Sequence, residues 1–141
     1  MANNESFDIE DNNDLIRAAY SETHYDESHI ETEEARDLMQ SAKRTLALKA
    51  GVTDFYDDRG LAVALLGTTC AKMKGAVENS PVRVDNVGPN DVTFRTSDGS
   101  SIQITQYEDM TQTGLANSSK TDAGVQRMEL TGTWLNDTRT A

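Results

Sequence analysis

The chain has 141 residues, a formal net charge of −11 and an apolar content of 36%. This length allows one domain at most, and the acidity argues against direct nucleic-acid binding, because phosphates need basic partners. The acids gather at the start, since residues 1–34 hold 11 acidic side chains and one base, Arg17. A compact enzyme has little use for this distribution, whereas a subunit that packs beside copies of itself can use it.

The residue usage also indicates a habitat. The chain has 14 Asp and 10 Glu, only 5 Lys against 8 Arg, and 16 Thr. Acid-rich, Lys-poor, Thr-rich chains resemble proteins of halophilic archaea and their viruses; the alternative is a protein from a moderate environment with an acidic end. Molar salt shortens the Debye length to about 3 Å and screens acid repulsion. From the sequence alone we therefore expect assembly to loosen at low salt.

No segment indicates export or membrane insertion. The N-terminal residues MANNESFDIE lack the basic and apolar regions of a signal peptide. The longest apolar run, Leu61–Gly67, is too short to cross a bilayer. The single cysteine, Cys70, lies in an apolar helical pattern, which predicts a small buried side chain.

The first half of the chain predicts helices. A short helix over 14–20, capped by Asn13 or Asp14, follows the acidic start. Thr32 is the expected N-cap of an amphipathic helix over 32–50, which Gly51 ends. The apolar positions of this second helix recur at helical spacing: Ala35, Leu38, Met39, Ala42 and Leu46.

A third helix is predicted over 58–78, opened by Asp54, Asp57 and Asp58. Gly67 and Gly75 lie inside it and would let another backbone approach closely. The short loop between the second and third helices favours an antiparallel helical hairpin. The side chains that we expect to be buried are Leu38, Leu46, Leu65, Leu66 and Met73.

After Pro81 the apolar period changes to two, which is typical of strands. Asp98-Gly99 is the strongest turn signal and predicts a hairpin between Val92–Thr96 and Ser101–Tyr107. A long polar loop over 111–124 and a last strand over 125–134 are expected to follow.

The predicted fold class is α+β: a small N-terminal helical bundle, made of an antiparallel helical hairpin plus a short helix, followed by a β-hairpin and an extended C-terminal arm. We divide the chain into an acidic flexible head (1–12), a helical bundle (13–80), a β-hairpin segment (81–110), and a polar loop with a C-terminal arm (111–141).

No motif predicts catalysis, a cofactor or a metal. His24 and His29 lie among acids but lack the spacing of a zinc motif, so they are interpreted as solvated surface. The acids over 8–14 lack the glycine and the glutamate of a calcium loop. The three aspartates before the third helix are explained as helix-start acids. We therefore expect a protein that is not an enzyme.

Trp134 has little local apolar sequence around it. It is interpreted either as part of the chain's own core or as an anchor on a partner subunit. The candidate inter-subunit contacts are Trp134, Leu135, Met128, Leu130 and Arg139 in the C-terminal arm and Asp98 and Gly99 in the hairpin turn.

The order of elements over residues 14–96 resembles the head–tail connector (adaptor, or head-completion) proteins of tailed viruses. The residues that carry this resemblance are the three predicted helices and the phrase Val82-Arg83-Val84-Asp85-Asn86-Val87-Gly88-Pro89-Asn90-Asp91-Val92-Thr93-Phe94. In that family a small helical bundle precedes a similar segment, in which a polar strand leads to a Val-Gly turn and a Val-Thr-aromatic strand. The strand-like pattern over 97–141 departs from the helical ending that the resemblance implies.

The resemblance implies a ring of adaptor subunits, typically twelve, in the neck of a virion, with assembly in the host cytoplasm. Its partners would be the portal protein and a tail or neck protein, and DNA would pass through without specific binding. The alternatives are another virion component, such as a tail-completion or decoration protein, an acidic haloarchaeal binding module, and a small metal-dependent enzyme.

Overall fold

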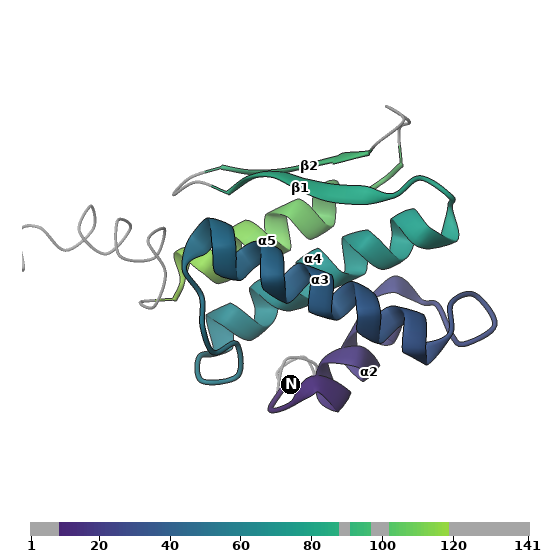
Figure 1. Cartoon of the computed structure of the whole chain (residues 1–141), viewed down its shortest axis with the longest axis horizontal. Helices are drawn as coiled ribbons and strands as arrows, with labels where there is room; N and C mark the ends of the chain where they lie inside the picture. Colours follow the sequence, from purple (N-terminus) through teal and green to yellow (C-terminus); the bar gives the residue numbers. More distant parts are fainter. Residues whose placement is uncertain (1–8, 88–90, 97–101, 119–141) are drawn as a thin grey trace, which may run out of the picture.

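The computed structural model describes residues 9–87, 91–96 and 102–118. These ranges form an α+β fold in which helices precede an antiparallel two-stranded hairpin, as the sequence predicts (Figure 1). The elements in chain order are α2 (Asn12–Thr23), α3 (Thr32–Ala50), α4 (Arg59–Val77), β1 (Val82–Val87), β2 (Val92–Thr96) and α5 (Thr105–Ala116).

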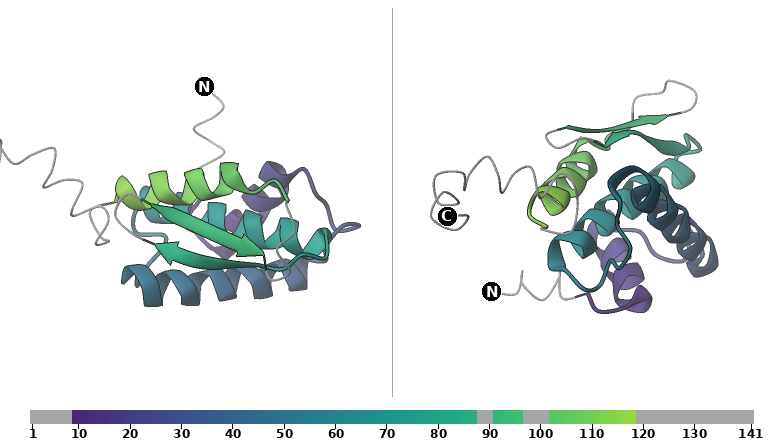
Figure 2. Two further views of the ribbon diagram at one scale, coloured as in Figure 1. Left: turned by 90° about the horizontal axis from the view of Figure 1, so that it is seen from above. Right: turned by 60° about the vertical axis from the view of Figure 1, so that its left-hand side comes forward.

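Helix α4 is the centre of the fold. It packs against α2, α3, α5 and β1. The hairpin lies on one side of the helical layer and α2 lies on the other (Figure 1). Seen from above, the strands run along the helices, with β1 toward α3 and β2 toward α5 (Figure 2).

The sequence of α4 explains its central position. The helix is apolar or small nearly all round, which is typical of a fully buried helix. Leu61, Leu65, Leu66 and Met73 are buried, and Cys70 is buried as predicted. Among the other predicted core residues, Leu46 is buried and Leu38 is only partly buried.

The helix ends follow local chemistry, with two corrections. The N-cap of α2 is Asp11, whose side chain accepts a hydrogen bond from the backbone N of Asp14, so neither Asn13 nor Asp14 is the cap. Thr32 is the first residue of α3, not its cap, and its hydroxyl donates to the Glu27 carboxylate. Gly51 ends α3 at φ 73°, in the left-handed conformation expected of it.

Residues 9–12, the last part of the predicted acidic head, take part in the described fold. Ile9 is buried and belongs to the hydrophobic core, and Asp11 caps the first described helix. An apolar side chain within an acidic stretch can still join the core.

The β-hairpin uses a different pair of strands from the pair expected around Asp98-Gly99. Strand β2 (Val92–Thr96) pairs with the strand before it in the chain, β1 (Val82–Val87). The register runs from Val82 opposite Thr96 to Val87 opposite Val92. The register shifts between Val84 and Asn86, as a β-bulge does. The predicted period of two is confirmed, because the buried residues alternate along both strands: Val82, Val84, Val92 and Phe94.

The predicted second strand, Ser101–Tyr107, is wrong from residue 105 onward, where α5 begins. The predicted polar loop over 111–124 is wrong for residues 111–116, which complete this helix. One face of α5 packs on the core, because three residues spaced four apart along the helix are all buried: Tyr107, Thr111 and Leu115. This contact with the core explains why residues 105–116 form a helix, and Asp98-Gly99 itself lies outside the described residues.

Backbone contact between α4 and α5 is very close. A Cβ atom added to Gly67 would lie 2.6 Å from the Thr111 hydroxyl oxygen and 2.8 Å from the Tyr107 carbonyl oxygen. At the other end of the contact, a Cβ on Gly60 would lie 2.5 Å from the Gly114 carbonyl oxygen. The close approach predicted for Gly67 is therefore confirmed, and α5 is the element that approaches.

Leu65→Ala is expected to lower the free energy of unfolding by about 2–5 kcal/mol, because it leaves a cavity at a fully buried position. Chemical denaturation followed by circular dichroism measures this. An unchanged midpoint would show that this face of α4 is not packed.

Gly67→Ala is expected to lower the free energy of unfolding by about 1–3 kcal/mol, although alanine is the better helix former. The added methyl group would collide with the backbone of α5. The control is Gly51→Asn, at a position with open space where asparagine tolerates the left-handed conformation. Equal stability of Gly67→Ala and wild type would contradict the close contact.

Candidate functional site

A pocket lies where α2, its following loop and the start of α3 meet. Its volume is about 350 Å³, within the range of ligand sites. The lining residues are Asn13, Ile16, Arg17, Tyr20, Tyr25, Asp26, Glu27, Thr32 and Arg36. The pocket thus combines apolar and aromatic surface with charges of both signs at its rim.

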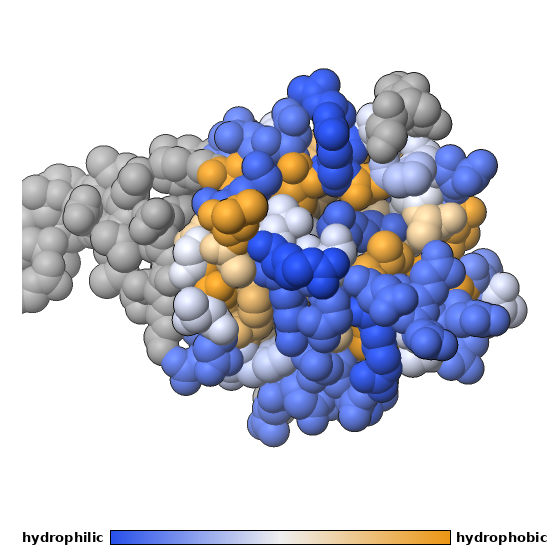
Figure 3. Space-filling model, in the orientation of Figure 1, coloured by the Kyte–Doolittle hydropathy of each residue, from blue (hydrophilic) through white to orange (hydrophobic). Residues whose placement is uncertain are grey.

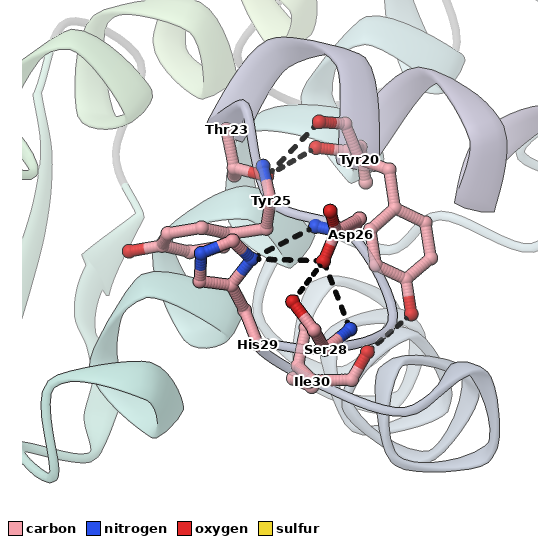
Figure 4. A network of polar contacts seen from close by, with 8 residues as sticks. Tyr20, Thr23, Tyr25, Asp26, Ser28, His29 and Ile30 are labelled. Atoms are coloured by element: carbon pink, nitrogen blue, oxygen red, sulfur yellow. Dashed lines mark hydrogen bonds and ion pairs between the residues drawn. The ribbon is translucent and has the colours of Figure 1, made fainter.

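The loop that walls this pocket is fixed by hydrogen bonds (Figure 4). The Tyr20 hydroxyl donates to the Ile30 carbonyl oxygen at 2.6 Å, which ties α2 to the end of the loop. The Asp26 carboxylate accepts from the backbone N and the hydroxyl of Ser28. These hydrogen bonds are the main cause of a lowered pKa for Asp26.

His29 completes the loop. Its Nδ1 lies 3.1 Å from both the backbone N and a carboxylate oxygen of Asp26, and its ring centroid is 5.1 Å from that of Tyr25. The imidazole is therefore engaged with its own loop. His24 ends α2 in the left-handed conformation at φ 63° and is exposed.

The other acids singled out in the sequence serve local structure. Asp58 caps α4 by accepting from the backbone N of Gly60 at 2.7 Å and of Leu61 at 3.4 Å. Asp54 accepts from the backbone N of Tyr56 at 3.1 Å. Within the described ranges, no group of three or more His, Cys, Asp and Glu side chains is placed to hold a metal ion.

A second candidate surface is the outer face of the hairpin. Arg83, Asp85 and Arg95 are exposed there, and Arg83 stands directly opposite Arg95 in the strand pair. Arg95 forms an ion pair with Asp85 at 2.9 Å, and this contact lowers the pKa of the Asp85 carboxyl. Arg83 and Lys49 of α3 also act on that carboxyl through space.

Lys72 lies beneath this face. Its side chain is buried, and its Nζ donates to the Val82 carbonyl oxygen at 3.2 Å. Burial lowers the pKa of Lys72, and the nearby Arg44 lowers it further. Positive charge therefore gathers around β1 from three elements: the hairpin, α3 and α4.

The predicted contact residues Trp134, Leu135, Met128, Leu130, Arg139, Asp98 and Gly99 all lie outside the described residues. The structure brings together two surfaces that sequence reasoning missed, the pocket and the charged hairpin face. The charged hairpin face did have a sequence signal: Arg83 and Asp85 occupy alternate positions of one strand, and Arg95 lies in the next strand.

Comparison with protein-family models, with curated proteins and with solved structures finds no match to this chain. Among the described helices, none is long and apolar enough to cross a membrane. The face seen in Figure 3 is mostly hydrophilic, with hydrophobic atoms in separate areas between polar side chains.

Lys72→Met is expected to raise the free energy of unfolding at neutral pH by about 1 kcal/mol, because it removes a buried cation and keeps the volume. The pKa of Lys72 is lowered in the folded chain, so folded wild type gains stability as pH rises from that pKa toward about 10.4. The difference between variant and wild type should therefore shrink over that range. Denaturation at several pH values tests this, and a constant difference would contradict it.

Proposed function

We propose that this protein is a structural subunit of a tailed virus, an adaptor that joins the portal to the tail and lines the DNA exit channel. The observation that carries the proposal is the order of elements over residues 14–96. Three helices precede a hairpin whose second strand is Val92–Thr96, which is the arrangement that the resemblance implies.

Helix α5 adds support. The sequence pattern after residue 97 departed from the helical ending that the resemblance implies. The helix over Thr105–Ala116 removes this departure for those residues. The Val82–Phe94 segment thus lies between a helical bundle and helix α5, which follows it in the chain.

The proposal is of a protein that is not an enzyme. In the part of the chain that the structure describes, Asp58 caps α4, Asp54 accepts a hydrogen bond within a turn, and the His29 imidazole is engaged with its own loop. Mechanical joining needs surfaces rather than reactive groups. We place the protein in the virion neck, after assembly in the cytoplasm of a halophilic archaeal host.

Two other functions compete with this proposal. A tail-completion or decoration protein would also be a virion component, but would occupy another place in the particle. An acidic haloarchaeal binding module would act as a monomer with a cellular partner. The molar mass in solution and the position in the particle separate these functions.

The test is the molar mass of the purified protein at about 0.1 M and at about 1 M KCl, measured by light scattering, with electron microscopy of the same samples. A closed ring that binds the portal protein is expected. A protein that stays monomeric and does not bind the portal would contradict the adaptor function. A particle reconstruction that places it on the capsid surface would favour decoration.

A further inference from the structure

Two groups of like-charged side chains can be distinguished on the folded chain. The acidic face comprises Glu22, Asp26, Glu27, Glu31, Glu33 and Glu34, from α2, the following loop and the first turn of α3. The basic patch comprises Arg44 and Lys49 of α3 with Arg83 and Arg95 of the hairpin. The hairpin and α2 lie on opposite sides of the helical layer (Figure 1).

The hairpin face is a sheet surface without a covering layer among the described residues. Alternate residues of both strands pack inward, while Arg83, Asp85 and Arg95 point outward and are exposed. Like charges directly opposite each other on a strand pair are unfavourable, and Asp85 pairs with Arg95. Arg83 is thus held beside a second guanidinium, an arrangement that a carboxylate-bearing partner would relieve.

An apolar side chain accompanies the basic patch. Leu48 of α3 is 86% exposed and lies four residues after Arg44, on the same side of the helix. A single exposed leucine has little meaning alone. Within a patch of four cations it supplies the apolar contact that docking surfaces combine with a charged rim.

We propose that the basic patch of one copy binds the acidic face of a second copy, head to tail. A second copy complements the patch in charge, because the acidic face carries six carboxylates and the patch carries four cations. The pocket beside the acidic face, with Tyr20 and Tyr25 in its lining, receives the hairpin side chains. Its own two cations are already engaged, because Arg17 pairs with Asp14 and Arg36 donates to Asn13. The inference deepens the proposed function, since it names the surfaces through which ring neighbours meet.

A nucleic acid fits the patch less well than a second copy. Four cations beside one carboxylate offer few phosphate contacts, and the net charge of −11 repels a polyanion at longer range. A contact between two different surfaces has a further consequence. It repeats from copy to copy and closes into a ring or continues as a filament.

The test is a charge swap. Variant A, Arg83→Glu with Arg95→Glu, makes the patch acidic, and variant B, Glu33→Lys with Glu34→Lys, makes the acidic face more basic. Each alone should associate at least about tenfold more weakly than wild type, because the attraction between the two surfaces is reduced in B and reversed in A. A mixture of A and B should regain association, because the unaltered acidic face of A then meets the unaltered basic patch of B.

The control is Asp109→Lys, which reverses an exposed acid on α5 that belongs to neither surface. It should associate as wild type does. Circular dichroism shows that each variant is folded, and sedimentation velocity at about 0.1 M and about 1 M KCl measures association. Association should weaken as salt rises, contrary to the expectation from acid repulsion alone.

Several results would overturn the head-to-tail contact. They are unchanged association of A or B, no rescue in the mixture, and association that strengthens with salt. A ring that persists in variant A and still binds the portal would overturn this contact while leaving the adaptor function in place. Binding of labelled duplex DNA that variant A abolishes, without self-association of wild type, would assign the patch to nucleic acid instead.

Discussion

Close backbone contact along α4 is the interaction on which the other elements depend. Gly60 and Gly67 bring α5 against the helix, and Gly75 lets Ser80 and Val82 turn back over it. A Cβ on Gly75 would lie 2.6 Å from the Ser80 carbonyl oxygen. The start of β1 is therefore set by this glycine, and the hairpin in turn carries Arg83 and Arg95 to the surface.

The three helices of the first half could be predicted because their signals are local. Helix α3 was predicted with the bounds that it has, Thr32–Ala50, from apolar spacing and from Gly51. The second half could not be predicted in this way. The buried face of α5 contains Thr111 and Gly114, two residue types that a sequence pattern assigns to loops. They belong to the core because they contact α4, and this contact is not local in the sequence.

The candidate surfaces were less predictable than the fold. The acidic face is a run in the sequence, so composition alone indicates it. The basic patch has no such run, because Arg83 and Arg95 become neighbours only through the strand register and Lys49 joins them from another helix. The pocket depends on hydrogen bonds such as that from Tyr20 to Ile30, which no residue pattern indicates.

The bulge between Val84 and Asn86 bears on how this chain avoids uncontrolled growth. A two-stranded sheet has an unpaired edge on each side, and such edges recruit further strands into fibres. The extra residue at Asp85 bends β1 and interrupts the regular spacing of its amide and carbonyl groups. A charged side chain at the same point adds a desolvation cost for any incoming strand. Strand β1 can thus present side chains on the hairpin face without offering a regular backbone edge as a template, and on β2 the backbone N of Phe94 already donates to the Glu108 carboxylate.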